Sequence, residues 1–133
     1  MRILLIEDDA DDIELLQEAL KNHAIAFEMD VIKDGKMALD HFRSSSFAPE
    51  IIILDLNLPK VHGRELIVEI KAVQTFKHIP LLILTTSSAK EDVEYAYKNG
   101  ADKYLIKPST IEKIRETVSI IVQLTSKNPV ENK

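Results

Sequence analysis

The sequence contains no cysteine and no tryptophan, and only three of its 133 residues are glycine. The absence of cysteine excludes a disulfide framework and any site that needs a thiolate as ligand or nucleophile. The glycines form no glycine-rich loop, so little is available to cradle the phosphate of a nucleotide or a flavin. No apolar run approaches the roughly 18 residues of a membrane span, and no basic segment precedes an apolar leader. We therefore expect a cytoplasmic protein with no membrane partner.

Length and charge narrow the class of protein further. A chain of 133 residues is expected to form one domain with a core of its own. Its composition, 45% hydrophobic and 29% charged, is that of an ordinary globular protein. The net charge of −5 and the lack of a basic stripe argue against direct binding to nucleic acid.

Five apolar runs alternate with five amphipathic runs along the chain. We expect strands at about 2–6, 26–32, 50–55, 80–85 and 102–106, and helices at about 10–22, 34–46, 63–75, 89–99 and 110–126. This alternation predicts an α/β fold in which helices cover both faces of a parallel sheet. In the second strand Phe27, Met29 and Val31 alternate with acidic residues, which indicates an edge strand. An edge position there fits the doubly wound, flavodoxin-like (βα)5 fold with strand order 2-1-3-4-5.

Polar residues stand where four of the predicted strands end. Glu7 and Asp8 follow the first strand and Asp55 ends the third, while Thr85 and Lys107 come at the ends of the fourth and fifth. The carboxyl ends of parallel strands share one edge of the sheet, where such folds bind their ligands. Three carboxylates, a hydroxyl and an ammonium group at one edge suit a divalent cation and a phosphoryl group.

These residues, in this order, resemble the receiver domain of two-component response regulators, of the single-domain type of the chemotaxis response regulator. The segment from Asp55 to Gly63, the approach Asn99-Gly100-Ala101-Asp102-Lys103-Tyr104 and the pair Lys107-Pro108 also match. The resemblance covers roughly residues 2 to 125. We expect a receiver domain over 1–126, a polar tail over 127–133, and no room for an output domain.

The resemblance implies that Asp55 accepts a phosphoryl group from a phosphohistidine on a sensor histidine kinase or a phosphotransfer protein. Mg²⁺, for which Mn²⁺ is expected to substitute, would neutralise the charge that develops on the phosphoryl oxygens. Asp8 and Asp55 would be direct ligands of the ion, and the backbone carbonyl of Asn57 would add an oxygen. Glu7 would act through a water or by contacting the groups that bind the ion. Without a cation the three carboxylates would repel one another, so at least one pKa should be raised.

Lys107 would pair with Asp55 at rest and with a phosphate oxygen after modification. By the same resemblance, we expect a cis peptide bond before Pro108. Thr85 would donate its hydroxyl to the phosphoryl group, and Tyr104 would swing inward as Thr85 moves. The signal would leave through a surface made by the fourth helix, the fifth strand and the fifth helix, toward a downstream protein or a second copy of the chain.

Further acids and the histidines are given structural roles. Asp9 is expected to cap the first helix, and Asp11 and Asp12 to lie in its first turn, where the helix dipole favours negative charge. A calcium loop would need a glycine at its sharp turn and a closing Glu, and the sequence has neither there. The histidines are too scattered for a metal cluster and are expected at the surface or in packing: His23, His41, His62 and His78.

Three other classes of protein compete with the receiver hypothesis. A flavin or nucleotide carrier with the same fold would need a glycine-rich loop to bind phosphate, and this sequence has none. An aspartyl-dependent phosphohydrolase usually has a second acid two residues after its nucleophile, where this chain has Asn57. A scaffold that works without phosphorylation would have no use for the full residue set. We therefore expect a stand-alone receiver that is not an enzyme beyond Mg²⁺-assisted self-phosphorylation and self-dephosphorylation.

Overall fold

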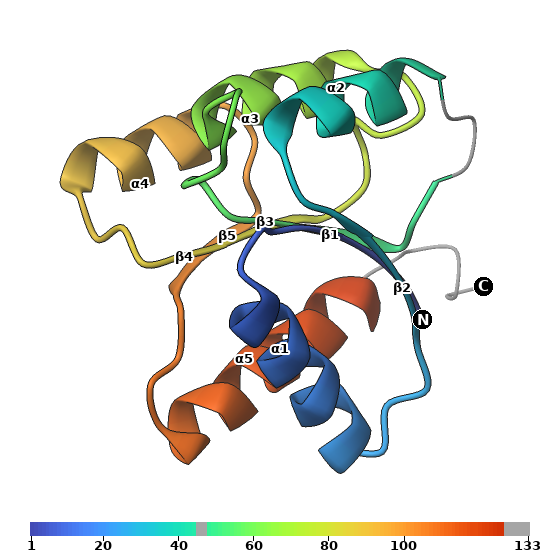
Figure 1. The fold of residues 1–133 in the computed structure, drawn as a ribbon, viewed down its shortest axis with the longest axis vertical. Helices are drawn as coiled ribbons and strands as arrows, with labels where there is room; N and C mark the ends of the chain where they lie inside the picture. Colours follow the sequence, from blue (N-terminus) through green and yellow to red (C-terminus); the bar gives the residue numbers. More distant parts are fainter. Residues whose placement is uncertain (45–47, 127–133) are drawn as a thin grey trace.

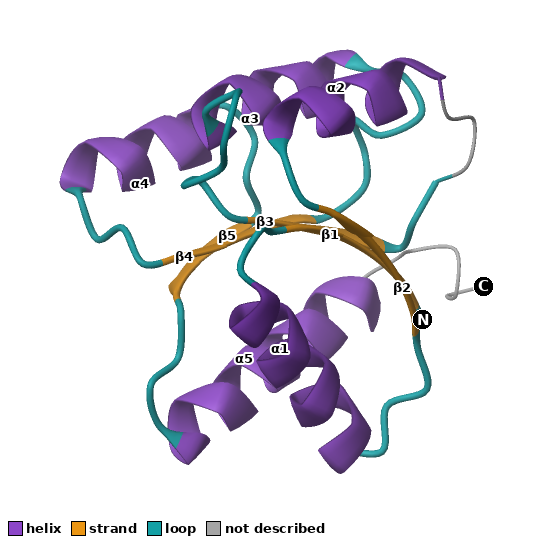
Figure 2. Cartoon of the chain, viewed as in Figure 1, coloured by secondary structure: helices purple, strands orange, loops and turns teal. Residues whose placement is uncertain are grey.

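The computed structural model describes residues 1–44 and 48–126, which form a five-stranded sheet between two layers of helices (Figures 1 and 2). The strands are β1 (Arg2–Ile6), β2 (Glu28–Ile32), β3 (Ile51–Leu54), β4 (Leu81–Thr85) and β5 (Lys103–Ile106). The helices are α1 (Ala10–Asn22), α2 (Gly35–Ser44), α3 (Gly63–Ala72), α4 (Lys90–Lys98) and α5 (Ile111–Ser126). The predicted tail over 127–133 and the predicted end of the second helix lie outside the described residues.

The sheet has the predicted order, β2-β1-β3-β4-β5, and every pair of neighbouring strands is parallel. Strand β2 is an edge strand, and its residues alternate between exposed and half-buried up to Ile32, which is buried. The order reverses between β1 and β3, so the chain leaves these two neighbouring strands toward opposite faces of the sheet. This divergence opens the carboxyl edge at the point where the predicted site residues emerge.

Two hydrophobic cores lie on the two faces of the sheet. Helices α2, α3 and α4 cover one face and α1 and α5 cover the other (Figure 1). Because successive strand residues point to opposite faces, Leu4 and Ile6 pack under α2 and α3, whereas Ile3 and Leu5 pack against α1 and α5. The central strands β3 and β4 are buried along their whole length, as their continuous apolar runs predict.

Local signals in the sequence set several boundaries. Asp9 caps α1, its side chain accepting a hydrogen bond from the backbone N–H of Asp12, as predicted. Gly100 follows the end of α4 with φ +110°, a conformation that a side chain disfavours. A Cβ on Gly63 would lie 2.4 Å from Cα of Leu56, so only glycine lets α3 begin this close to the loop after β3.

Two boundaries within the described residues differ from the predicted ones by more than one residue. Strand β2 begins at Glu28 rather than at 26, because its pairing partner β1 begins at Arg2, opposite Glu28. Helix α3 ends at Ala72 rather than at 75, since Val73 takes an extended conformation. The chain then turns so that Phe76 becomes fully buried and its ring meets that of Phe42 edge-on.

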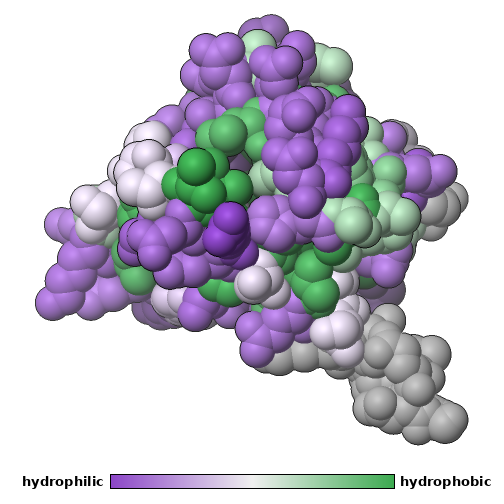
Figure 3. Space-filling view, turned by 90° about the horizontal axis from the view of Figure 1, so that it is seen from below, coloured by the Kyte–Doolittle hydropathy of each residue, from purple (hydrophilic) through white to green (hydrophobic). Residues whose placement is uncertain are grey.

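The face formed by α1 and α5 is mostly polar, with apolar groups between the charged ones (Figure 3). Leu15 and Ile111 are two exposed apolar residues of these helices. Within the described residues, none of the helices is both long enough and apolar enough to cross a membrane.

Candidate functional site

Backbone hydrogen bonds continue one residue beyond the strands and place three site residues at one edge. The N–H of Glu7 donates to Ile32, that of Asp55 to Ile6, and that of Lys107 to Thr85, at 2.8 to 3.0 Å. The sheet itself therefore fixes where these three side chains start. Glu7 and Lys107, which are 100 positions apart in the sequence, are brought together by strand pairing and not by a loop.

The three predicted carboxylates form one cluster at this edge. Glu7 and Asp55 are each only 3% exposed, whereas Asp8 is exposed. One oxygen from each of Glu7, Asp8 and Asp55 lies within 4.8 Å of the others. Since Mg²⁺ holds oxygen ligands at about 2.1 Å, ligands on one ion lie up to about 4.2 Å apart. Small side-chain rotations would suffice, so this donor set fits a hard divalent cation.

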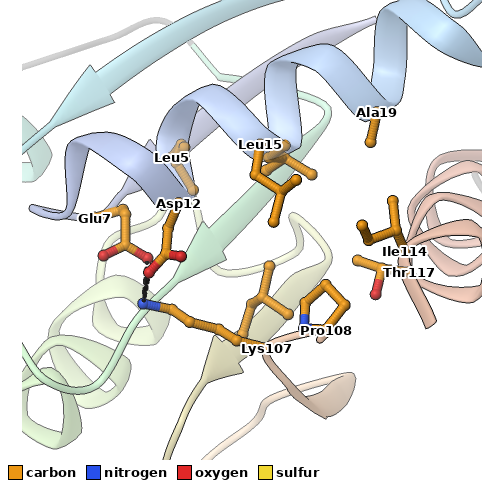
Figure 4. A pocket seen from close by; sticks show the side chains of 11 residues that line it. Leu5, Glu7, Asp12, Leu15, Ala19, Lys107, Pro108, Ile114 and Thr117 are labelled. Carbon is orange, nitrogen blue, oxygen red and sulfur yellow. Dashed lines mark hydrogen bonds and ion pairs between the residues drawn. The ribbon is translucent and has the colours of Figure 1, made fainter. Parts of the chain in front are cut away.

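Lys107 provides a positive charge inside the cluster. Its Nζ lies 2.9 Å from Oε1 of Glu7, 2.7 Å from Oδ2 of Asp12 and 3.1 Å from Oδ2 of Asp55. Figure 4 shows its ammonium group facing Glu7 and Asp12, with the side-chain stem running back toward Pro108. The pKa of Lys107 is raised because its hydrogen bonds to these carboxylates outweigh the effect of burial, which lowers it. The ammonium group therefore stays charged.

The pKa of Glu7 is raised to about 7, chiefly because the carboxyl is buried. The hydrogen bond from Lys107 opposes that shift, and the nearby charge of Asp55 adds to it. The expectation that one carboxyl of the cluster has a raised pKa is confirmed, but its main cause is desolvation and not repulsion.

The pKa of Asp55 moves the other way. Burial raises it, but hydrogen bonds from Thr85, from the backbone N–H of Asn57 and from Lys107 together lower it below its usual range. The two buried acids therefore differ in charge near pH 7. Asp55 is a carboxylate, while Glu7 exchanges a proton.

Thr85 and Asn57 complete the floor of the site. Thr85 is fully buried, and its Oγ1 lies 3.5 Å from Nδ2 of Asn57. The same amide also donates to Oγ1 of Thr86 at 3.3 Å. The exposed Thr86 thus holds the side chain of Asn57 beside Asp55, whose Oδ1 accepts the backbone N–H of Asn57 at 3.2 Å.

Tyr104 lies inward in this structure, 9% exposed. Its hydroxyl donates to the backbone carbonyl of Ser87 at 2.8 Å, which ties β5 to the loop after β4. The hydroxyl of Ser87 donates in turn to Asp92 at 2.5 Å. Arg64 of α3 donates to the same carboxylate from Nε at 2.7 Å. A chain of hydrogen bonds thus links Tyr104 to α4 and α3.

Comparisons with known proteins agree with this geometry. The family model "Response regulator receiver domain" matches residues 3–119. The chain belongs to that family. It is 38% identical over 121 residues to the response regulator Rcp1 of Synechocystis, covering 87% of this chain and 82% of that protein. It is 37% identical to the probable methanogenesis regulatory protein FilR2 of Methanothrix harundinacea, over 90% and 79% of the two chains.

Solved structures of relatives have the same fold. The Mn²⁺-bound form of Rcp1 aligns with a TM-score of 0.80 and 38% identity over 90% of each chain. The phosphorylated cyanobacterial phytochrome response regulator RcpA aligns with a TM-score of 0.80 and 36% identity, over 90% and 89% of the two chains. Both the receiver family and the flavodoxin-like fold expected from the sequence are therefore confirmed.

One expectation for this receiver is wrong. The peptide bond between Lys107 and Pro108 is trans, the isomer that X–Pro bonds favour intrinsically, and not cis. The trans bond is compatible with Lys107 reaching all three of its carboxylate partners.

Two residues have contacts that the sequence analysis did not assign to them. His62, expected only at the surface or in packing, accepts the backbone N–H of Arg64 at Nδ1 and so caps α3. Asp12 lies in the first turn of α1, as predicted, but it also contacts Lys107. The sequence contains a signal for this contact, because side chains at the start of a helix lean toward its N-terminus, and α1 starts at the site.

Proposed function

We propose that this receiver accepts a phosphoryl group on Asp55 from a phosphohistidine of a sensor histidine kinase or a phosphotransfer protein. The observation that carries the proposal is the state of Asp55. It is a buried carboxylate with a lowered pKa, 3.1 Å from a lysine ammonium group and beside Asp8, at the carboxyl edge of the sheet. Phosphorylation of this kind is group transfer onto the protein itself, so the chain acts as a signalling phosphoacceptor and not as a turnover enzyme.

The chemistry asks for an ionised, oriented carboxylate. An oxygen of Asp55 would attack phosphorus while the bond from phosphorus to the donor imidazole breaks, and the imidazole leaves. Asp55 is held for this by Lys107 at Oδ2 and by the N–H of Asn57 at Oδ1. Lys107 and the hydroxyl of Thr85 are the donors within reach of the new phosphoryl oxygens.

A bound Mg²⁺ or Mn²⁺ would supply the remaining positive charge. Asp8 and Asp55 would hold it directly, together with the backbone carbonyl of Asn57. Glu7, whose Oε1 lies 2.9 Å from Nζ of Lys107 and whose Oε2 accepts the N–H of Asp9, would act through a water. The existence of a Mn²⁺-bound form of Rcp1 supports the binding of a divalent ion by this chain.

The signal would leave through α4, β5 and α5. Thr85 moving toward a phosphoryl group would pull on the loop whose Ser87 carbonyl holds the hydroxyl of Tyr104. The same loop is tied through Asp92 to Arg64, so a movement there reaches the start of α4. The exposed surface beside it carries mixed charges and a tyrosine, which suits a reversible partner or homodimer contact: Lys90, Glu91, Glu94, Tyr97, Lys98 and Lys103.

This role belongs in the cytoplasm, with a downstream protein and not a nucleic acid as the target. The net charge of −5 supports the second point, since a negative surface repels a phosphate backbone.

Labelling with acetyl phosphate followed by mass spectrometry tests the proposal. The unmutated protein should gain one phosphoryl group that requires Mg²⁺ and is labile in base, because it is an acyl phosphate. Asp55→Asn should gain none, since an amide cannot form that bond. Asp11→Asn, an exposed acid of the first turn of α1, is the control and should label normally. Labelling that persists in Asp55→Asn, or that ignores a chelator, would show that another residue is the acceptor.

A further inference from the structure

Asp12 makes the shortest contact to Lys107 in the site, with its Oδ2 2.7 Å from Nζ. The corresponding distances from Glu7 and Asp55 are 2.9 and 3.1 Å. Unlike those two acids, Asp12 does not follow a strand but belongs to the first turn of α1. It is also less buried, with 35% of its side chain exposed. Lys107 is therefore held from the helix as well as from the sheet.

The ammonium group of Lys107 has as many acidic neighbours as it has N–H bonds. An ammonium group carries three N–H bonds, and Nζ of Lys107 has three carboxylate oxygens within 3.1 Å. Glu7 and Asp55 fix the ammonium group from the side of the sheet. Asp12 approaches from α1 and closes the third direction (Figure 4).

Packing alone does not fix the lysine stem. A cavity of about 30 Å³, enough for one water molecule, lies between α1 and α5 and borders Lys107. Its walls are mostly apolar and include Leu15, Ala19 and Ile114 (Figure 4). A flexible four-carbon side chain beside unfilled space can change rotamer freely unless its charged end is anchored.

The position of Asp12 is itself well fixed. Its backbone N–H donates to Oδ1 of Asp9, the residue that caps α1. Because helical side chains lean toward the N-terminus of their helix, Asp12 leans toward the carboxyl edge of the sheet. Asp11, one residue earlier in the same turn, is exposed. The two neighbouring acids thus have the same charge and the same helix dipole but different surroundings.

We propose that Asp12 is a positioning residue for the phosphoryl transfer, which anchors the ammonium group of Lys107 so that one of its N–H bonds points at Asp55. The inference rests on the proposed function of Asp55 as phosphoacceptor. When Asp55 carries a phosphoryl group, the N–H bond that pointed at its Oδ2 is the one that meets a phosphoryl oxygen. Asp12 acts through the lysine and touches neither the acceptor nor the phosphoryl group.

The charge of Asp12 is expected to slow phosphorylation, whereas positioning of Lys107 would speed it, so the two effects must be separated. A carboxylate close to the acceptor repels an incoming phosphodonor, which is an anion, and would slow the reaction. Asp12→Asn removes the charge but keeps an oxygen that can accept from Nζ, whereas Asp12→Ala removes both. The two substitutions therefore separate the hydrogen bond from the charge.

The first experiment observes Lys107 directly, in the unmodified protein without metal. The side-chain ¹⁵N–¹H signal of its ammonium group is followed by NMR, with assignment by its loss in Lys107→Arg. An anchored ammonium exchanges its protons slowly with water, so a separate signal is expected in the unmutated protein, in Asp12→Asn and in the control Asp11→Ala. In Asp12→Ala the signal should broaden or disappear. An unchanged signal in Asp12→Ala would show that Asp12 does not anchor the lysine.

The second experiment measures the rate of Mg²⁺-dependent labelling by acetyl phosphate. Asp12→Ala should be slower by about three- to tenfold, the effect of losing one partly exposed hydrogen bond. Asp12→Asn and Asp11→Ala should stay within about twofold of the unmutated rate. Faster labelling of both Asp12 variants would show that repulsion dominates and would overturn the proposal, as would equal slowing of Asp12→Ala and Asp12→Asn.

These experiments distinguish a wrong assignment of the phosphoacceptor from a wrong assignment of the role of Asp12. If Asp55 is not the acceptor, Asp55→Asn still labels, while the ammonium signal continues to report on Asp12. If only the positioning role is wrong, Asp55→Asn fails to label, and either the ammonium signal or the rate of Asp12→Ala does not change. Denaturation curves of each Asp12 variant identify any loss of labelling that comes from unfolding.

Discussion

A basic residue lies among acids at both ends of the sheet, but only one of these clusters suits chemistry. At the amino end, Arg2 of β1 lies 3.1 Å from Glu28 and 3.1 Å from Asp30 of β2. All three side chains are open to water, with 36%, 77% and 54% of their surfaces exposed. Ion pairs of this kind contribute little to stability, because water and salt screen them.

At the carboxyl edge, Lys107 has similar distances to its acids but far less water around it. Its side chain is 13% exposed, and those of Glu7 and Asp55 are 5% and 4% exposed. The pKa values of the two acids shift in opposite directions: burial raises that of Glu7, whereas hydrogen bonds outweigh burial at Asp55 and lower its pKa. The comparison shows that distance between charges does not by itself make a functional site. The loss of water does, because it lets a few neighbours decide which group carries a proton.

The largest difference between the two clusters should appear when the cation is removed. Lys107→Met keeps much of the side chain's bulk but leaves Glu7 and Asp55 facing each other without a counter-charge. We expect the free energy of unfolding to fall by about 3 kcal/mol in chelator near neutral pH, the usual effect of breaking a buried ion pair from one side. Urea denaturation measures it.

Mg²⁺ provides a control for this prediction. An ion that binds the native carboxylates stabilises the folded state, so it should return part of the stability lost in Lys107→Met. A loss that is the same with and without Mg²⁺ would mean that the lysine stabilises the fold by packing and not by charge.

The raised pKa of Glu7 predicts a pH dependence of stability. Glu7 has a pKa of about 7 in the folded state and 4.5 as its ordinary value, so between these pH values the folded protein binds more protons than the unfolded one. Stability should therefore fall as the pH rises from 4.5 to 7, by at most about 3 kcal/mol from this group. The lowered pKa of Asp55 changes stability chiefly below about pH 3.8, its ordinary pKa, and therefore outside this window.

The variant Glu7→Gln isolates this contribution. It cannot ionise, so in metal-free buffer its free energy of unfolding should exceed that of the unmutated protein more at pH 7.5 than at pH 5. Titration of the histidines is common to both proteins and cancels in the difference. Parallel pH profiles for the two proteins would show that Glu7 has an ordinary pKa.

Binding of the metal should separate the exposed acid from the buried one. Asp8→Ala is expected to weaken Mg²⁺ binding by about tenfold, because we place Asp8 in direct contact with the ion. Glu7→Ala is expected to weaken it by about threefold, since we place Glu7 behind the direct ligands, where it would act through a water. Calorimetric titration with Mg²⁺ and Mn²⁺ measures both affinities. Equal losses would show that this ranking of the ligands is wrong.

The sequence predicts the fold well because the sheet is simple to recognise. Strands buried on both faces require continuous apolar runs, and such runs mark β1, β3 and β4. Ends of helices are harder to place, because tertiary packing competes with local preference. Helix α3 ends three residues early, and the turn that follows buries Phe76 against Phe42, a contact between segments that no local pattern shows.

The site is predictable to the extent that strands place it. Glu7, Asp55 and Lys107 follow strands, so sheet pairing alone brings them together. Asp12 lies on a helix, where two explanations for an acid coincide: the helix dipole and the reach to Lys107. Composition and periodicity support the first, whereas the second needs the lean of the side chain toward the site and the distance across it. The unequal pKa values of Glu7 and Asp55 also depend on burial, which neighbouring residues in the sequence do not determine.

The smallest effect is expected at the exposed end of the sheet. Arg2→Met makes the same kind of change as Lys107→Met, yet it should lower the free energy of unfolding by only about 0.5 kcal/mol, since its partners Glu28 and Asp30 remain in water. The loss should shrink further in 1 M salt, where charges are screened beyond about 3 Å. Mg²⁺ should not affect it, and labelling of Asp55 should proceed at the unmutated rate. If Arg2→Met costs as much as Lys107→Met, burial is not what distinguishes the two clusters.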